Sequence, residues 1–240
     1  MHIIKLSAID STNSYLRNMV SGGEIEDMTT VVTLKQTKGK GQMGSSWTSD
    51  EGKNLTASVF KHNVELSIEQ AFLISQIVSV SIIDSLRMLG VRNLKIKWPN
   101  DILADKKKIG GILIENIIKT QQLQSSIIGM GINVNQENFP GLPQASSMKS
   151  LTGKHFDLDA VLITILKEIE QNFTDTDTEY IRSLYIKYLF RLNKPSTFLN
   201  SDENNFTGYI RGVTDQGKLI VEIEDGILRE FDLKEVKMLY

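Results

Sequence analysis

A glycine-containing loop between two apolar segments is the feature that most limits what this chain can fold into. Residues 33–49, TLKQTKGKGQMGSSWTS, contain the pattern G-x-G-x-x-G at Gly39, Gly41 and Gly44. In a dinucleotide-binding βαβ unit a helix begins directly after such glycines, so that the pyrophosphate meets the helix N-terminus. Here the following residues, SSWTSDEGKNLTASVF, are typical of a turn and then a strand. The sequence therefore disfavours a dinucleotide-binding fold and makes a dehydrogenase a remote alternative.

Hydrophobic spacing along the chain predicts an α+β domain at residues 1–194 and a small β module at residues 195–240. The longest periodic segment is expected to be a buried helix with a capping box at Ser67 and Gln70 and an end at Gly90. After residue 195, short alternating segments are separated by DQG and EDG, which favours strands joined by turns. Helices are expected at residues 11–20, 66–90, 157–173 and 177–190, and strands at 2–6, 29–36, 54–60, around the turns at 99–101 and 104–107, and at 125–135.

Composition excludes several kinds of site. The chain has no cysteine, which excludes a disulfide framework, a thiolate metal site and a cysteine nucleophile. The histidines His2, His62 and His155 lack the spacing of a zinc site, so we expect no metal-ligand cluster. The net charge of −2 gives no reason to expect a nucleic-acid partner. No signal peptide or apolar stretch of roughly 20 residues is evident, so we expect a cytoplasmic protein without a membrane partner.

Two groups of residues suggest that the chain binds an anion. Glycines let backbone N–H groups approach an anion closely, and Lys35, Lys38 and Lys40 add positive charge around the glycine loop. Such a loop standing alone is as often a solvent-exposed hairpin. Lys108 stands directly before IGGILIE, a segment expected to be a buried strand, so its ammonium either reaches solvent or serves an anion. Trp98, by contrast, indicates core packing.

Taken together, DSTN, QTKGKGQMGSSW, KWPNDIL, KKKIGGILIE and GMGINVN resemble, in order and spacing, the catalytic domain of biotin protein ligases. The resemblance spans about residues 1–194, and the β module also fits it. It implies a class II synthetase-like α+β domain, with helices on a mixed or antiparallel sheet, and a C-terminal SH3-like β-barrel.

The resemblance also implies the reaction. Biotin and ATP, with Mg²⁺ balancing the phosphate charge, would form biotinyl-5′-AMP and pyrophosphate. A lysine on the biotin carboxyl carrier domain of a biotin-dependent carboxylase would then accept the biotin. The chain begins almost at the catalytic domain, so we expect a monofunctional enzyme without DNA-binding activity, either a monomer or a homodimer.

Individual residues correspond to the family's motifs. Lys108 matches the lysine that contacts the biotin carboxylate and then the phosphate, and it is the residue expected to act in catalysis. Trp47 resembles an aromatic residue near the adenine, and Asn100 and Asp101 match a turn with a structural or metal-assisting role. For Asn133, a buried amide that satisfies the backbone is an equal alternative. The expected biotin and adenylate contacts are Ser11, Thr12, Asn13, Gln36, Gly39, Lys40, Gly41, Gln42, Trp47, Lys108, Gly110, Gly111, Gly129, Gly131 and Asn133.

The glycine loop departs from the family pattern, and other functions remain open. Many relatives have G-R-G-R where this chain has G-K-G-Q, so Lys40 loses the planar fork of arginine and Gln42 loses the charge. We therefore expect faster escape of the adenylate, unless Lys38 compensates. A lipoyl ligase or octanoyl transferase of the same fold is the nearest alternative, and GKGQMGSSW and KWPNDIL favour biotin over it. A biotin-sensing protein without turnover is another, which Lys108 and the glycine loop disfavour.

Overall fold

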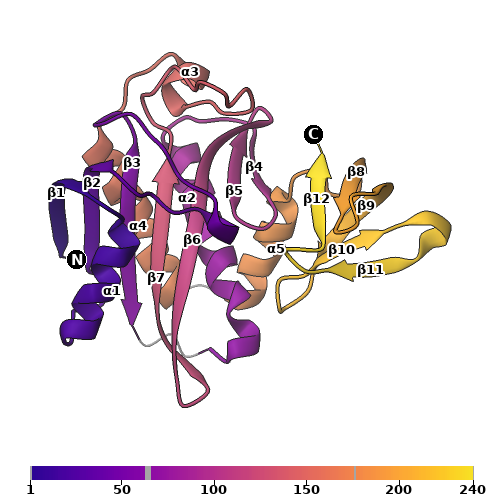
Figure 1. The fold of residues 1–240 in the computed structure, drawn as a ribbon, viewed down its shortest axis with the longest axis horizontal. Coiled ribbons are helices and arrows are strands. Elements are labelled where there is room, and N and C mark those ends of the chain that lie inside the picture. Colours follow the sequence, from indigo (N-terminus) through magenta and orange to yellow (C-terminus); the bar gives the residue numbers. More distant parts are fainter. Residues whose placement is uncertain (1, 63–65, 176, 240) are drawn as a thin grey trace.

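The computed structural model describes residues 2–62, 66–175 and 177–239, which form two β-sheets joined by helices (Figure 1). The larger sheet has seven strands in the order β1-β2-β3-β7-β6-β5-β4. Its first pair, β1 and β2, is parallel, and its other pairs are antiparallel. The strands are β1 Ile3–Ile9, β2 Thr30–Gln36, β3 Leu55–His62, β4 Leu94–Lys97, β5 Asp101–Ala104, β6 Lys107–Lys119 and β7 Gln122–Ile132.

Helices cover both faces of the larger sheet. Helix α1 lies on the face that also carries the glycine loop, while α2, α4 and α5 lie on the opposite face (Figure 1). The helices are α1 Thr12–Gly22, α2 Phe72–Met88, α3 Met148–Thr152, α4 Leu158–Thr174 and α5 Thr178–Tyr188, with short 3₁₀ turns at Gln42–Gly44, Ile68–Gln70 and Glu224–Gly226. The expected α+β architecture is confirmed, and the glycine loop leads to a strand as its sequence predicts.

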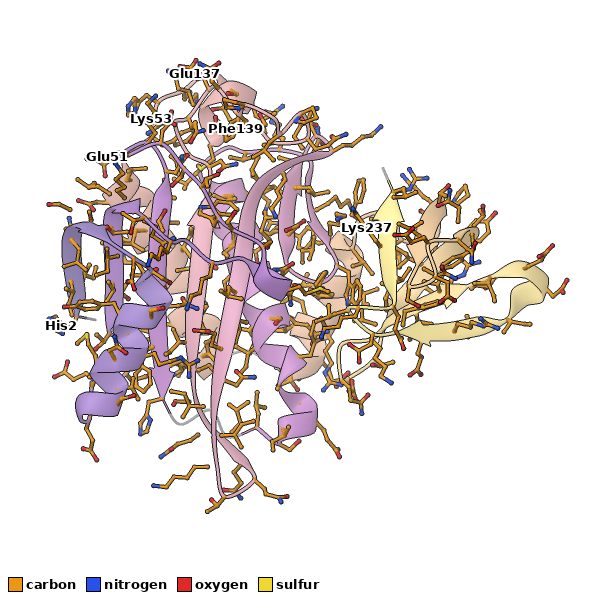
Figure 2. All side chains as sticks on the ribbon, in the orientation of Figure 1. His2, Glu51, Lys53, Glu137, Phe139 and Lys237 are labelled. Atoms are coloured by element: carbon orange, nitrogen blue, oxygen red, sulfur yellow. The ribbon has the colours of Figure 1, made fainter. Side chains whose placement is uncertain are left out.

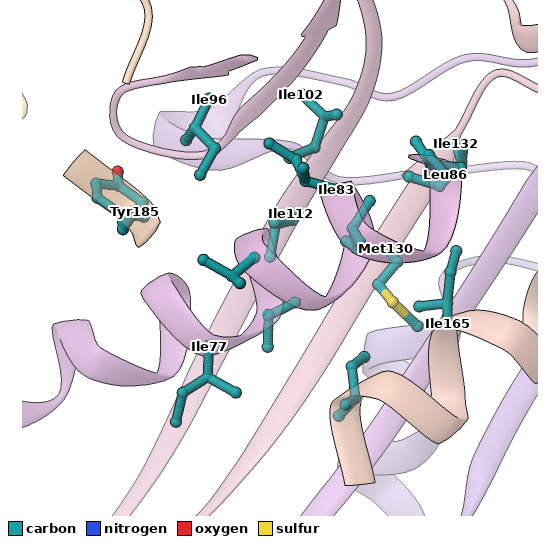
Figure 3. Close-up of a cluster of buried hydrophobic side chains, with 14 of the residues drawn as sticks. Ile77, Ile83, Leu86, Ile96, Ile102, Ile112, Met130, Ile132, Ile165 and Tyr185 are labelled. Atoms are coloured by element: carbon teal, nitrogen blue, oxygen red, sulfur yellow. The ribbon is translucent and has the colours of Figure 1, made fainter. Parts of the chain in front are cut away.

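Helix α2 is the centre of the hydrophobic core. Ile74, Val78 and Ile82 are fully buried. Figure 3 shows Ile77, Ile83 and Leu86 of α2 among side chains of the sheet, with Ile165 of α4 and Tyr185 of α5. Two serines of α2 are paired within the helix, because Ser81 and Ser85 donate to the carbonyls of Ile77 and Ser81, while the buried Ser79 hydroxyl has no hydrogen-bond partner among the described residues. The residues that fix the position of this helix therefore also fix the sheet that carries the site.

The ends of α2 follow from local chemistry. At the start, Gln70 accepts a hydrogen bond from the Ser67 N–H at 3.2 Å in the expected capping box, within a 3₁₀ turn that precedes the α-helix. At the end, Gly90 has a φ of +90°, a conformation that favours glycine. The predicted capping box and glycine end are confirmed, although the α-helix itself begins at Phe72.

The expectation that no apolar stretch approaches the roughly 20 residues needed to cross a membrane is wrong. The helical segment Ile68–Met88 has 21 residues and is apolar enough, by length and composition alone, to cross a membrane. Its most apolar window is 67% buried inside the protein, between the sheet and the neighbouring helices. Its apolarity is therefore that of a core helix.

The C-terminal residues form a second sheet with strand order β11-β10-β9-β8-β12. Phe198, Ile210 and Val221 from this sheet belong to the same hydrophobic cluster as the core of the larger sheet. Trp98 Nε1 donates to the carbonyl oxygen of Gly217, in the expected DQG turn, at 2.8 Å. The β module is confirmed as far as residue 239; Tyr240 lies outside the described residues. The strands of the C-terminal sheet are β8 Pro195–Asn200, β9 Asn205–Val213, β10 Leu219–Glu222, β11 Leu228–Phe231 and β12 Val236–Leu239.

Hydrophobic spacing and turn residues do not predict helix α3 or the β6–β7 turn. Helix α3 has five residues, which is too short to show a helical period. Strands β6 and β7 form one long hairpin whose turn residues, Thr120 and Gln121, both have positive φ. Glycine and asparagine are the usual residues in such turns, so a Thr-Gln pair gives no indication of one.

Candidate active site

A cavity of about 400 Å³ lies between the N-terminus of α1, the glycine loop and strands β6 and β7; we call it the main cavity. A side cavity of about 360 Å³ shares Ser46, Trp47 and Lys108 with it. On another side, a groove of about 300 Å³ between the larger sheet and the C-terminal sheet shares Lys97 and Lys237 with the main cavity; we call it the module groove. The main cavity, the side cavity and the module groove therefore adjoin one another at one region of the larger sheet.

Most of the residues expected at the site line the main cavity. Gly39, Gly110 and Asn133 do not. The Gly39 carbonyl accepts from the Trp47 N–H at the base of the loop, and a Cβ on Gly110 would lie 2.7 Å from Ile132 Cδ1 in the core. The expected residues that line the main cavity are Ser11, Thr12, Asn13, Gln36, Lys40, Gly41, Gln42, Trp47, Asn100, Asp101, Lys108, Gly111, Gly129 and Gly131.

Asn133 lies in the wall of the side cavity. Its side chain donates to the Ser146 carbonyl at 3.0 Å, and its N–H donates to the Ile109 carbonyl at 2.7 Å. The Asn133 amide therefore pairs with the backbone, which is the alternative that the sequence left open for this residue.

The floor of the main cavity is a buried polar cluster at the start of α1. Ser11 caps this helix, and its side chain accepts from the Ser14 N–H. Thr12 donates to Gln36 Oε1 through its N–H at 2.8 Å and through its hydroxyl at 3.1 Å. The Ser58 hydroxyl lies 2.5 Å from Asn13 Oδ1. Capping the helix therefore places hydroxyl and amide groups at the cavity.

Gly129 has no side chain because the Asn13 amide takes that space. A Cβ on Gly129 would lie 2.4 Å from Asn13 Oδ1 and 3.1 Å from the Leu113 carbonyl oxygen. Any larger residue on β7 at this point would displace the amide.

The glycine loop places an aromatic ring on two paired glycines. Gly111 on β6 and Gly131 on β7 are register partners. A Cβ on Gly131 would lie 2.4 Å from Trp47 Cε2, and one on Gly111 would lie 3.4 Å from Trp47 Cζ3. The indole Nε1 is shielded from solvent and has no hydrogen-bond partner among the described residues. The Trp47 ring separates the main cavity from the side cavity, and its Nε1–H remains available as a hydrogen-bond donor.

Lysines dominate the charge of the main cavity. Lys108 Nζ lies 2.6 Å from Asp101 Oδ1, and Lys97 Nζ lies 3.8 Å from Asp101 Oδ2. The lining holds four lysines (Lys40, Lys97, Lys108 and Lys237) and one aspartate, a formal charge of +3. The whole chain carries −2. The cavity is therefore a local positive site suited to an anion.

The environment of Lys97 changes its acidity. Burial lowers the pKa of Lys97, and the neighbouring charges of Lys108 and Lys237 lower it further, while Asp101 opposes them. A buried ammonium with a lowered pKa among like charges is stabilised by an incoming anion.

Backbone contacts set the positions of Asp101 and Lys108. Asn100 donates its side-chain amide to the Ile112 carbonyl at 2.6 Å, which fixes the turn before Asp101 and gives Asn100 a structural contact. Lys108 N–H donates to the Gln144 carbonyl at 2.7 Å, and its own carbonyl accepts from the Ser146 N–H at 3.0 Å. These last bonds hold the wall of the side cavity against Lys108.

Two lysines at the site were not expected from the sequence. Lys97 is the register partner of Asp101 across the β4–β5 hairpin, so its place in KWPNDIL is a usable signal. Lys237 comes from β12, and Figure 2 shows it on the side of the C-terminal sheet that faces the larger sheet. Its contact with the site depends on how the two sheets pack, and no local pattern indicates it.

Comparison with known proteins agrees with the geometry. Residues 6–133 match the family described as the biotin/lipoate A/B protein ligase family. The chain is 31% identical over 235 residues to the bifunctional ligase/repressor BirA of Bacillus spizizenii, covering 94% of this chain and 71% of that protein. It is 25% identical over 224 residues to the biotin–[acetyl-CoA-carboxylase] ligase of Mycobacterium tuberculosis, covering 89% and 80%.

A solved structure gives the same result over the whole fold. The biotin protein ligase from Aquifex aeolicus, in complex with biotin and ATP, superposes with a TM-score of 0.82 at 26% identity. The match covers 99% of this chain and 98% of that one, so both sheets are included. A family match over more than half of the chain, together with relatives along nearly all of it, shows that this chain belongs to the biotin/lipoate A/B protein ligase family.

Proposed function

We propose that this chain is an ATP-dependent biotin–protein ligase, which forms biotinyl-5′-AMP and transfers biotin to a lysine of a biotin carboxyl carrier domain. The observation that carries the proposal is the position of Lys108, whose side chain lines both the main cavity and the side cavity. An acid in the first cavity and a nucleotide in the second would meet at this ammonium.

The polar floor favours biotin over lipoate. A cyclic urea carries N–H donors and a carbonyl acceptor, and the cavity lining offers the amide of Asn13 and the hydroxyl of Thr12, with Ser58 behind Asn13. The dithiolane of lipoate carries neither, so it would leave the second lone pair of Asn13 Oδ1 without a partner on binding. A site built to pair with such groups rejects a ligand that lacks them.

The first step joins two anions. A carboxylate oxygen of biotin attacks the α-phosphorus of ATP, the bond from that phosphorus to the bridging oxygen breaks, and pyrophosphate leaves. Lys108 would leave Asp101 to neutralise the carboxylate and the α-phosphate, while Lys97 and Lys237 face the outer phosphates. Fixed charges that are already in place stabilise the transition state without reorganisation.

The side cavity suits an adenine ring. Phe139, Leu142 and Pro143 provide apolar wall, and Trp47 closes the side toward Lys108. Figure 2 shows Phe139 at one end of the larger sheet, in the loop that contains Glu137. The free Trp47 Nε1 donor would pair with an acceptor on the ligand. The glycine loop that carries Trp47 would then cover the adenylate and shield it from hydrolysis.

In the second step the neutral ε-amine of the acceptor lysine attacks the carbonyl carbon of the adenylate. A C–N bond forms, the bond from carbon to the phosphate oxygen breaks, AMP leaves, and the nitrogen loses a proton. The lysines of the main cavity disfavour another ammonium and so favour the neutral, nucleophilic form of the amine.

The described residues do not form a magnesium site of their own. They contain no group of three or more His, Asp or Glu residues that could hold a metal ion, and Asp101 is engaged by Lys108. Magnesium would therefore accompany ATP on its phosphate oxygens. The proposal places the protein in the cytoplasm, where ATP and the carrier domain are available.

Biotin-dependent ATP–pyrophosphate exchange tests the proposal. We expect exchange with biotin and none with lipoate. Lys108→Ala should lower the exchange rate by roughly 10²-fold or more, because a transition-state charge partner is lost. Lys119→Ala, at the exposed tip of the β6–β7 hairpin, is the matched control and should behave as wild type.

Each other outcome identifies an alternative. Exchange with lipoate alone would make the chain a lipoyl ligase. Binding of biotin without any exchange would make it a sensor, and an unchanged Lys108→Ala rate would remove Lys108 from the mechanism.

A further inference from the structure

The Asn13 amide at the floor of the main cavity has a single orientation. Its Nδ2 donates to the Leu113 carbonyl at 3.3 Å and to Glu115 Oε2 at 3.2 Å. Its Oδ1 accepts from the Ser58 hydroxyl at 2.5 Å. Both amide hydrogens are therefore used, and the oxygen keeps a second lone pair beside Gly129, which lines the cavity.

Glu115 makes the reverse orientation unfavourable. Turning the amide over would bring its oxygen to within about the same distances of the Glu115 carboxylate and the Leu113 carbonyl, where three acceptors would face one another. It would also leave two amide hydrogens toward the cavity in place of one acceptor. A carboxylate holds the amide more firmly than a neutral acceptor would.

Glu115 is itself held in place from helix α1. Arg17 Nη2 lies 3.4 Å from Glu115 Oε2. Arg17 and Asn13 are four residues apart on α1, so both side chains lie on the helix face toward β6. The Glu115 side chain is 28% exposed and does not line the main cavity, so it acts from behind the amide.

We propose that Glu115 is a positioning residue that fixes the Asn13 amide with its oxygen toward the main cavity, and so selects acids whose head group carries an N–H donor. This rests on the proposed function of the site. A urea N–H would find its acceptor at Asn13, whereas an acid with a dithiolane head group would bury that acceptor unpaired. The selection between the two acids of this family would thus be set partly by a residue that touches neither.

Calorimetric titration of biotin into Glu115→Ala and Glu115→Gln tests the proposal. We expect Glu115→Ala to weaken biotin about 10-fold, as for the loss of one half-buried charge-assisted contact. Glu115→Gln should recover most of this affinity, because its carbonyl oxygen still accepts from Asn13. Desthiobiotin, which keeps the cyclic urea, should weaken in parallel with biotin, while lipoate affinity and the KM for ATP stay unchanged.

The matched control is Glu222→Ala in the C-terminal sheet. Glu222 pairs with Arg211 at 2.9 Å, and its side chain is 30% exposed, so the variant removes a similar ion pair remote from the main cavity. It should leave biotin affinity unchanged. Combining Glu115→Ala with Asn13→Ala gives a second test, since a residue that acts through Asn13 should add nothing once that amide is gone.

Several results would overturn the proposal. They are unchanged biotin affinity in Glu115→Ala, equal losses in Glu115→Ala and Glu115→Gln, additive losses with Asn13→Ala, or a rise in the KM for ATP that matches the loss of biotin affinity. If the wild type itself fails to bind biotin, the proposed function is what fails. If it binds biotin and only these variants disagree, the proposed function stands and the role of Glu115 does not.

Discussion

At the scale of single residues, the shape of the site is set by positions that lack a side chain. Gly129 leaves room for the Asn13 amide, and Gly131 leaves room for the Trp47 ring. Neither glycine has a positive φ, so the backbone alone would tolerate another residue. Both are explained by the close approach of Asn13 and Trp47, which links the β7 sequence directly to the shape of the main cavity.

Gly131→Ala should therefore impair binding with little effect on the fold. The new Cβ would lie 2.4–2.8 Å from three atoms of the Trp47 indole, so the ring and its loop must move. Overpacking of this kind costs about 1–3 kcal/mol, which we expect to appear as a roughly 10- to 100-fold loss of biotin affinity. Calorimetry measures the affinity, and the unfolding temperature reports the fold.

Gly22→Ala is the control for that substitution. Nothing lies within 4 Å of a Cβ added there, and the position has no positive φ. Wild-type affinity in Gly131→Ala would show that the position of Trp47 does not matter for binding.

At the scale of elements, the sequence predicts what is local and periodic. The buried face of α2 and its glycine end were predictable because they depend on spacing and on one backbone conformation. The strand after the glycine loop was predictable because SSWTSDEGKNLTASVF does not fit a helix. Helix α3 and the Thr120-Gln121 turn were not, because one is too short and the other uses residues unusual for its turn type.

The residues of the site also divide into those that local sequence indicates and those that depend on distant contacts. Residues within motifs, such as Asn13 and Lys108, were expected at the site because their neighbours in sequence carry the resemblance, and both line the main cavity. Glu115 also lies within a motif, but its role depends on a contact with α1 about a hundred residues earlier in the chain. Ser58 contacts Asn13 and Lys237 lines the cavity only through sheet pairing and sheet packing, which leave no trace in local sequence.

The β4–β5 hairpin gives the site a pH dependence. Burial, together with Lys108 and Lys237, lowers the pKa of Lys97 from its ordinary value of 10.5 against the opposing effect of Asp101. As the pH rises through this lowered pKa, Lys97 loses its charge, and in the proposed arrangement the site would lose part of its attraction for the phosphates of ATP. We expect the KM for ATP to rise at an alkaline pH below 10.5, and initial rates across that range measure it.

The stability of the fold should increase over the same pH range in which ATP binding weakens. In the unfolded chain Lys97 regains its ordinary pKa, so between the two pKa values the unfolded chain binds more protons than the folded one. The free energy of unfolding contributed by Lys97 therefore rises with pH in that window. Asp101→Asn removes the one opposing charge and should move the rise in KM to lower pH. A KM profile that is identical in Lys97→Met and wild type would contradict this role.

At the scale of the whole molecule, the C-terminal sheet shares the hydrophobic core of the larger sheet, and the turn at Gly217 adds specific contacts. Trp98 donates to the Gly217 carbonyl, and the Phe72 ring lies where a Cβ on Gly217 would be. Phe72 also packs edge-on against Tyr185, with ring centroids 5.6 Å apart. These contacts hold the turn of the C-terminal sheet against α2 and α5, and the same sheet carries Lys237 to the main cavity.

Displacing that turn should weaken ATP binding from a distance. Gly217→Ala adds a Cβ 2.4 Å from the Phe72 ring at a φ of +88°, so the turn must shift and loosen the Trp98 hydrogen bond. If the turn positions Lys237, the variant should raise the KM for ATP about as much as Lys237→Ala, roughly 10-fold for the loss of one charge-assisted contact. Biotin affinity, which depends on the floor of the main cavity, should stay unchanged.

Gly226→Ala separates the packing effect from backbone strain. Gly226 also has a positive φ, +72°, but nothing lies within 4 Å of a Cβ added there. We expect both glycine variants to lower the unfolding temperature and only Gly217→Ala to raise the KM for ATP. The double variant of Gly217→Ala with Lys237→Ala should show no further rise, because both remove the same contact. Equal KM changes in the two glycine variants, or additive changes in the double variant, would mean that the C-terminal sheet acts on ATP by some route other than Lys237.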